Sequence, residues 1–315
     1  MNARHAHAVL ALLGGAALAA PARAACDRHQ VGEIPVAMKG LRPMVAAKIN
    51  GSDAQMVLDT GGTTSLLMPG SDTKFALAQK PSDPRYTFRS SGRTVHVLMT
   101  EATDFAFAGA TYHNVEFPIP EAGFEAGVDG TFGQDRLGDA DVEIDLAHGV
   151  VRLFAPQGCE TADLAGWKDT QLVSVIDIEP TRASAPRIFG SVSANDVTLR
   201  VLFDTGTEHS AMTLAAAKKA GVNPQAAGKA PLGGSLGVGG GVPMATWPAR
   251  FESFKIGEEE IIGALLRVVD KPNASADMLL GADFFVGHRV FISKSQHKLY
   301  FAANQDNVFG REQRP

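Results

Sequence analysis

The chain contains the sequence Val57-Leu58-Asp59-Thr60-Gly61, followed after three residues by Ser65, and the pattern occurs again as Leu202-Phe203-Asp204-Thr205-Gly206 with Ser210. Each copy reads apolar, apolar, Asp, Thr, Gly, three variable residues and Ser. A single Asp-Thr-Gly has little meaning in a chain of 315 residues. Two copies with matching flanks indicate an internal repeat, and the repeat sets the frame for every other motif.

The repeat keeps its register over most of the chain. The two aspartates are 145 positions apart (204 − 59 = 145). Further on, residues 131–135 match residues 279–283, and their glycines are 148 positions apart (281 − 133 = 148). Residues 153–155 match residues 300–302 at a separation of 147 (302 − 155 = 147). Because the separation drifts by so little, we predict two homologous lobes.

The repeat and the segments between its copies predict five regions. We expect a signal peptide at residues 1–24, an N-terminal lobe at 25–158, a linker at 159–171, a C-terminal lobe at 172–305 and a tail at 306–315.

The first region has the three parts of a secretory signal. Arg4 gives a basic start, residues 8–20 are apolar, and Ala22-Arg23-Ala24 has the small-x-small pattern of a cleavage site. The apolar run is shorter than the roughly 20 residues that a membrane-spanning helix needs. We therefore expect cleavage after Ala24, export to a bacterial periplasm and no membrane span in the mature chain.

The charge of the mature chain argues against two classes of partner. The full chain has 29 basic and 34 acidic residues, and loss of Arg4 and Arg23 leaves a net charge of 27 − 34 = −7. Such a balance favours neither nucleic acid nor an anionic lipid surface.

Two cysteines, Cys26 and Cys159, remain after cleavage. An even count in an oxidising compartment favours a disulfide between them. The alternatives are lipid attachment at Cys26, which Arg23 disfavours, and two free thiols.

Alternating apolar residues and turn signals predict a mostly β chain in which helix is scarce. In each lobe a turn, Asn50-Gly51 or Asn195-Asp196, joins two strands into a hairpin that ends at the aspartate. One short helix is predicted over residues 212–220, which are rich in Ala and Lys. Further strands are predicted over residues 94–107, 111–119, 129–133, 141–144, 150–154, 172–178, 247–256, 261–269 and 277–280.

The repeated motif places a carboxylate at a tight turn after a buried strand. Gly61 and Gly206 permit the sharp turn because they have no Cβ. Thr60 and Thr205 are suited to hydrogen-bond across a pseudo-twofold axis and hold the two turns together.

If the lobes pair, Asp59 and Asp204 face each other. Two adjacent carboxyl groups share one proton and titrate as a unit. One can then act as general base on a water and the other as general acid towards a peptide carbonyl, so this chemistry requires neither a metal nor a cofactor.

These two motifs, each followed by an apolar-apolar-Gly strand, resemble those of retropepsin-type aspartic proteases, and in particular the exported bacterial members that carry two such lobes in one chain. The resemblance covers both lobes. It implies two homologous retropepsin/pepsin-like closed β-barrel lobes around a pseudo-twofold axis, with Asp59 and Asp204 as the catalytic pair. Support of the site is expected from Thr60, Gly61, Ser65, Thr205, Gly206, Ser210, Gly133 and Gly281.

The chain departs from the family pattern in two places. Thr131 stands where the family prefers an aliphatic residue, and no tyrosine falls clearly at a flap tip, Tyr86 being the nearest. Flaps are expected near residues 88–95 and 233–243. The glycine-dense second segment lacks the Lys-Ser/Thr ending of a phosphate-binding loop, which favours a mobile flap.

Other polar residues have weaker functional interpretations. His209 beside Ser210 suggests a nucleophile and base, but neighbours on one turn rarely face each other. Asp135 and Asp283 recur after the two glycines and are expected to be structural caps. The remaining histidines lack the spacing of metal ligands.

The sequence therefore predicts an aspartic endopeptidase that acts on peptides or proteins as a monomer. The alternative is a non-catalytic peptide-binding envelope protein with the same fold. A third possibility is that the lobes act only after assembly into a true dimer.

Overall fold

The computed structural model describes residues 26–304, except 83–86, 91–92, 122–126, 158, 160–171, 183, 185, 227–230, 232–233, 236–243 and 272–273. The predicted signal peptide, the C-terminal tail, Tyr86 and most of the predicted linker lie outside the described residues.

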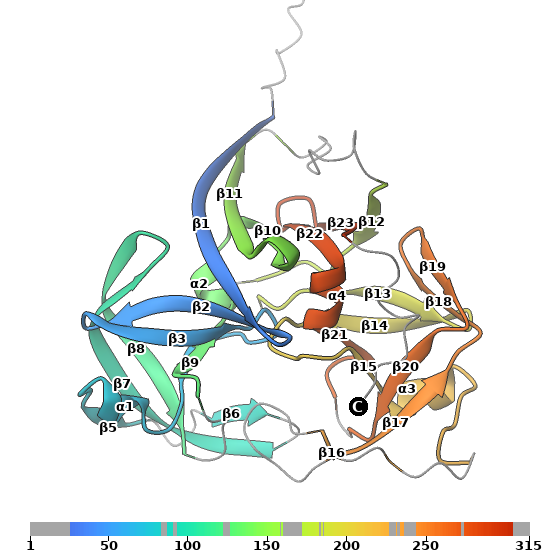
Figure 1. Ribbon diagram of the computed structural model, residues 1–315, viewed down its shortest axis with the longest axis horizontal. Coiled ribbons are helices and arrows are strands. Elements are labelled where there is room, and N and C mark those ends of the chain that lie inside the picture. Colours follow the sequence, from blue (N-terminus) through green and yellow to red (C-terminus); the bar gives the residue numbers. More distant parts are fainter. Residues whose placement is uncertain are drawn as a thin grey trace, which may run out of the picture.

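The chain is mostly β, as predicted, and most strands of its two halves lie in two groups, one on each side of Figure 1. The elements of the first half are β1 (Asp27–Lys39), β2 (Arg42–Ile49), β3 (Ser52–Leu58), β4 (Leu66–Leu67), α1 (Ser71–Lys74), β5 (Gln79–Pro81), β6 (Thr87–Ser90), β7 (Arg93–Phe107), β8 (Ala110–Pro120), β9 (Gly130–Phe132), α2 (Gln134–Leu137), β10 (Asp141–Asp145), η1 (Leu146–His148) and β11 (Val150–Gln157). Those of the second half are β12 (Ser174–Asp177), β13 (Phe189–Ala194), β14 (Val197–Phe203), β15 (Ala211–Thr213), α3 (Leu214–Lys219), β16 (Gly234–Ser235), β17 (Met244–Arg250), β18 (Ser253–Ile256), β19 (Glu259–Ile262), β20 (Leu265–Val269), β21 (Met278–Leu280), α4 (Ala282–Gly287), β22 (His288–Ser293) and β23 (Lys298–Ala303).

The hairpins that lead to the aspartates form where the turn residues predict them. Asn50 and Gly51 have φ values of 49° and 81°, and they join β2 to β3. Asn195 and Asp196, with φ values of 47° and 61°, join β13 to β14 in the same way. Two consecutive residues with positive φ give the turn whose twist matches that of paired strands.

A second strand runs parallel to each aspartate strand. β9 lies beside β3, with Leu58 opposite Phe132, and β21 lies beside β14, with Phe203 opposite Leu280. Buried apolar side chains of both halves, these four among them, form one cluster. The core therefore extends beneath both aspartates.

Strands from both halves also form one sheet that joins them, in the order β12-β23-β22-β10-β11-β1. These strands lie above the two lobes in Figure 1. The two halves meet where β10 pairs antiparallel with β22, with Glu143 opposite Phe291. These two residues are also equivalent in the repeat, because 291 − 143 = 148. The pseudo-twofold axis therefore passes between Glu143 and Phe291.

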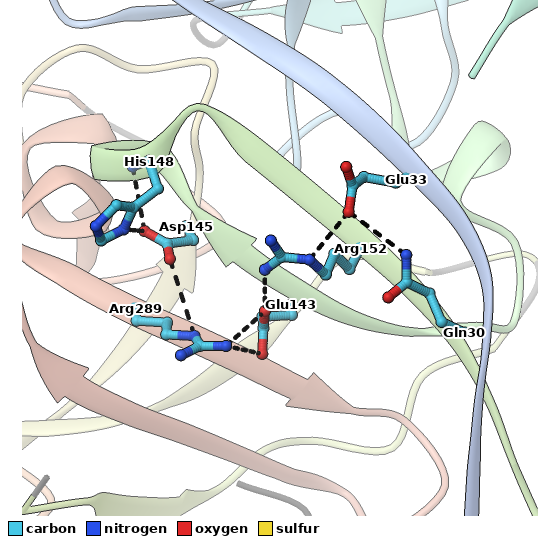
Figure 2. Close-up of polar contacts among 7 residues, drawn as sticks. All are labelled: Gln30, Glu33, Glu143, Asp145, His148, Arg152 and Arg289. Atoms are coloured by element: carbon cyan, nitrogen blue, oxygen red, sulfur yellow. Dashed lines mark hydrogen bonds and ion pairs between the residues drawn. The ribbon is translucent and has the colours of Figure 1, made fainter. Parts of the chain in front are cut away.

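A charged cluster lies beside this axis (Figure 2). The side chain of Glu143 is only 2% exposed, and it accepts from Arg152 at 2.7 Å and from Arg289 at 3.0 Å. Arg152 belongs to β11 and Arg289 to β22, so one buried carboxylate binds a guanidinium from each half. Arg152 also contacts Glu33 at 3.1 Å, and Arg289 lies 3.9 Å from Asp145.

The predicted disulfide is present between Cys26 and Cys159. Cys26 precedes β1 and Cys159 follows β11, and these strands pair with Asp27 opposite Gln157. The disulfide therefore extends the end of an existing ladder.

Several predicted elements differ in detail. The strands expected over 247–256 and 261–269 each break in two, because the chain bends at Glu252 and at Gly263, whose φ is 67°. The predicted helix is shorter, as α3, and α1, α2, α4 and the short η1 were not predicted. The described strand paths of both sheets have open ends, so they do not close into the expected barrels. No described helix is long and apolar enough to cross a membrane.

Candidate active site

The loops that follow β3 and β14 meet through two threonines. The backbone amide of Thr60 donates to Oγ1 of Thr205 at 3.1 Å, and the amide of Thr205 donates to Oγ1 of Thr60 at 3.0 Å. Each hydroxyl then donates to a carbonyl of the opposite strand, Thr60 to Phe203 at 2.9 Å and Thr205 to Leu58 at 2.7 Å. Both threonines are buried. The four bonds fix the relative position of the two loops.

The two glycines bring each aspartate against the opposite loop. A methyl group built on Gly61 would lie 2.3 Å from Cγ of Asp204, and one built on Gly206 would lie 2.5 Å from Oδ1 of Asp59. Any side chain at either position would displace an aspartate. The structure therefore brings Asp59 and Asp204 together, with both retaining some exposure to solvent.

Burial and proximity change the acidity of the pair. Burial raises the pKa of Asp59 well above its usual value, and the negative charge of Asp204 raises it further. Burial also raises the pKa of Asp204, although hydrogen bonds from Thr207 and the Gly206 amide act in the opposite direction. Two carboxyl groups in this arrangement hold one proton between them over a wide pH range.

Ser65, the serine of the first motif, is hydrogen-bonded to two residues of the segment that follows β9. Ser65 Oγ donates to Oδ1 of Asp135 at 2.7 Å and accepts from the amide of Gly133 at 2.9 Å. A methyl group on Gly133 would lie 2.8 Å from the carbonyl carbon of Thr64, so only glycine allows this approach.

The second lobe repeats the same contacts. Ser210 Oγ donates to Oδ1 of Asp283 at 2.6 Å and accepts from the amide of Gly281 at 3.0 Å. A methyl group on Gly281 would lie 2.6 Å from the carbonyl oxygen of Thr207. All the site residues predicted from the motif therefore lie on, or directly behind, the two aspartate loops.

Asp135 and Asp283 are structural, as expected, but they do not stand at the N-cap positions of helices. The N-cap positions of α2 and α4 are Gly133 and Gly281, and neither makes a side-chain cap. Both carboxylates bind the motif serines, and that of Asp283 also accepts from the amide of Phe284 in α4 at 2.9 Å. Their recurrence at equivalent positions was the signal that could have identified this role.

Gln134 contacts the first loop, and sequence reasoning did not find it. Its side-chain amide donates to the carbonyl of Thr60 at 3.0 Å, and its backbone amide donates to the carbonyl of Gly62 at 3.0 Å. The second lobe has Ala282 at the equivalent position, so the repeat gave no signal for this side chain.

Both hairpins expected to carry flaps form, and the structure describes the paired strands at their bases. β6 pairs with β7, and β16 pairs with β17. Both hairpins lie at the lower edge of Figure 1, away from the joining sheet. Within the expected flap segments 88–95 and 233–243, residues 91–92, 233 and 236–243 lie outside the described residues.

The alternative chemistry at His209 has no support from the contacts. The hydroxyl of Ser210 is engaged by Asp283, and Nδ1 of His209 lies 3.9 Å from that carboxylate. Within the described part of the chain, no three His, Cys, Asp or Glu side chains are grouped to bind a metal ion.

Among the comparisons with known proteins, the match to a family model agrees with the repeat. A comparison with curated protein sequences found no match. Among solved structures, the crystal structure of Basic 7S globulin from soybean is similar with a TM-score of 0.48 and 12% sequence identity, covering 89% of this chain and 96% of that one. A similarity this distant carries no conclusion about function. The family model described as aspartyl protease matches residues 45–136 and 190–284, one segment in each lobe and together more than half of the chain. The chain therefore belongs to the aspartyl protease family.

Proposed function

We propose that this protein is an aspartic endopeptidase, in which Asp59 and Asp204 activate a water molecule for attack on a peptide bond. The observation that carries the proposal is the contact between the two aspartate loops, where each glycine admits the carboxyl group of the opposite lobe. Membership of the aspartyl protease family supports the same reaction class.

The chemistry requires one ionised and one protonated carboxyl group. The ionised group removes a proton from the water, whose oxygen attacks the carbonyl carbon, while the protonated group donates to the carbonyl oxygen. Burial favours this singly protonated state because it raises the pKa of both aspartates. No covalent enzyme intermediate is needed.

The substrate is proposed to be an extended peptide between the hairpins β6–β7 and β16–β17. Such a peptide can pair with strand edges through its backbone, so affinity does not depend on one side chain. We also propose export to the periplasm, which the N-terminal signal pattern and the disulfide support. Cell fractionation tests that location.

A monomeric enzyme is proposed because one chain supplies both aspartates. Sedimentation of the active mature chain tests this, and activity confined to a dimeric fraction would contradict it.

The experiment that tests the function is cleavage of a peptide library from acidic to neutral pH. Asp59→Asn and Asp204→Asn should each lower kcat/KM by roughly 10²- to 10⁴-fold, the usual contribution of a general acid or base. Asp53→Asn is the matched control, since Asp53 lies on β3, the strand that leads to Asp59, is exposed and pairs with Lys48.

The outcomes separate the two candidate functions. Cleavage by the wild type and by Asp53→Asn, lost in both dyad variants, supports the endopeptidase. Cleavage that survives either dyad substitution would overturn the mechanism. A folded wild type that binds library peptides without cleaving them would instead identify a peptide-binding protein.

A further inference from the structure

The two aspartate loops differ at one position that contacts a carboxyl group. The third residue after the aspartate is Gly62 in the first lobe and Thr207 in the second. Oγ1 of Thr207 donates to Oδ2 of Asp204 at 3.1 Å. The first lobe has no hydroxyl to offer at the equivalent place.

As a result, the second carboxyl group accepts a hydrogen bond from a hydroxyl of its own loop. Both oxygens of Asp204 accept a hydrogen bond, Oδ1 from the amide of Gly206 at 3.0 Å and Oδ2 from Thr207. Asp59 accepts at Oδ1 from the amide of Gly62 at 2.8 Å, and the amide of Gly61 also stabilises its carboxylate, but no side-chain hydroxyl among the described residues of its own loop contacts it. Donors aimed at both oxygens stabilise a carboxylate more than a carboxylic acid.

A threonine would not fit at the equivalent position of the first lobe. A methyl group built on Gly62 would lie 2.7 Å from Oδ2 of Asp59, closer than two such atoms can approach. A threonine at that position would therefore move the aspartate that it was meant to contact.

A positive charge favours the same member of the pair. Lys271 follows β20, is partly buried, and attracts Asp204. The other ionisable groups on this loop are Glu208, which pairs with Arg42 at 2.6 Å, and His209, which lies near Asp283.

We propose that Thr207 and Lys271 make Asp204 the ionised member of the pair and leave the shared proton on Asp59. This assignment rests on the proposed function and gives each carboxyl group one role in it. Asp204 removes a proton from the water as the oxygen bonds to the carbonyl carbon, and Asp59 gives its proton to the carbonyl oxygen. Asp204 then passes its proton to the amide nitrogen as the carbon–nitrogen bond breaks, and Asp59 recovers its own from the hydroxyl.

The electrostatics of the pair agree with the geometry. Burial and the neighbouring charge raise the pKa of Asp59, and the amides of Gly62 and Gly61 oppose them only in part. For Asp204 the Thr207 hydroxyl and the Lys271 charge oppose the effect of burial on the pKa. Thr207 and Lys271 act through Asp204 and are positioning residues.

The test is a carbon NMR titration of the aspartate carboxyl groups in the mature protein, which requires no substrate. In the wild type, the Cγ signal of Asp204 should shift in the lower ionisation step and that of Asp59 in the upper step. Thr207→Val should raise the lower pKa by about one unit, the size expected for losing one hydrogen bond to a carboxylate. Thr207→Ser should restore it.

Two further variants control the measurement. Thr63→Val removes a hydroxyl from the first loop, where Thr63 is exposed, and should leave both ionisation steps in place. Lys271→Met should raise the lower pKa without touching the hydroxyl, which keeps the test decisive if Thr207→Val does not fold.

The pH dependence of kcat/KM offers a second readout. The assignment would also be supported if the acid limb moves to higher pH in Thr207→Val and is back at the wild-type pH in Thr207→Ser. An Asp59 signal that shifts first, or a lower pKa unchanged in both Thr207→Val and Lys271→Met, would overturn it. Because the titration is independent of cleavage, failure of the assignment is distinguishable from failure of the proposed function.

Discussion

Thr60 and Thr205 exchange hydrogen bonds, each donating its backbone amide to the hydroxyl of the other, at 3.1 and 3.0 Å. Because each hydroxyl also donates to a strand carbonyl, neither side chain can be removed without leaving buried groups unpaired. The contact is thus both a structural link between the lobes and the part that sets the distance between the carboxyl groups.

Thr60→Val is therefore expected to lower stability and activity together. It removes one donor and one acceptor at a buried site, which should cost about 2 to 4 kcal/mol of unfolding free energy. Urea denaturation and peptide cleavage measure the two effects. Thr60→Ser keeps the hydroxyl and should retain most of both, and equal losses in the two variants would contradict the role of the hydrogen bonds.

Gly61→Ala should lower activity far more than a surface glycine substitution does. Its methyl group would lie 2.3 Å from Cγ of Asp204, so the carboxyl group has to move. We expect at least about a 10²-fold lower kcat/KM, as for other misplaced catalytic groups. Gly32→Ala is the control, because a methyl group there would lie 3.5 Å from Leu153 in ordinary contact. An active Gly61→Ala enzyme would show that the loops are not rigidly paired.

The protonated dyad should make stability fall as pH rises. The pKa of Asp59 is raised by burial and by Asp204, so the native state keeps a proton that the unfolded chain releases near pH 4. Between these two pKa values, stability should decline by up to about 1.4 kcal/mol per pH unit. Asp59→Asn removes the titrating group, so it should flatten the decline and be more stable than the wild type at neutral pH.

Urea denaturation across that pH window measures the effect. Asp53→Asn is the control, because the hydrogen bond and charge of Lys48 lower the pKa of Asp53 instead. If Asp59→Asn shows the same decline as the wild type, the proton does not reside on Asp59.

Glu143→Gln should destabilise the joint between the lobes. The buried carboxylate binds Arg152 and Arg289, and its neutralisation leaves two guanidinium groups without their shared partner. Loss of one partner from a buried ion pair costs about 3 kcal/mol. Glu260→Gln, in an exposed pair with Lys255, should change stability by less than about 1 kcal/mol. Similar midpoints in urea for the two variants would contradict the importance of the cluster.

The sequence alone sufficed for the features that occur twice. Asp59 and Asp204, with their threonines, glycines and serines, could be predicted because each residue in one lobe has a counterpart in the other. The hairpins that carry them were predicted for a local reason, since consecutive residues such as Asn50-Gly51 adopt the required positive φ values.

Features present in one lobe escaped prediction. The position equivalent to Gln134 in the other lobe is Ala282, and the position equivalent to Thr207 is Gly62. Because the residues differ, comparison of the two halves does not identify Gln134 or Thr207. Arg42 reaches Glu208 across 166 positions of the chain, and no local pattern reports such a contact. The breaks at Glu252 and Gly263 were missed because apolar alternation continues through a bend.

The pairing of Glu143 with Phe291 on the pseudo-twofold axis also determines which lobes fit together. Two N-terminal lobes docked in this way would place two Glu143 carboxylates opposite each other, and like charges opposed in a ladder are destabilising. Two C-terminal lobes would place two copies of Phe291 there, with no carboxylate for either Arg289. One lobe of each kind satisfies both positions, so the two sides of the axis are different and each selects the other.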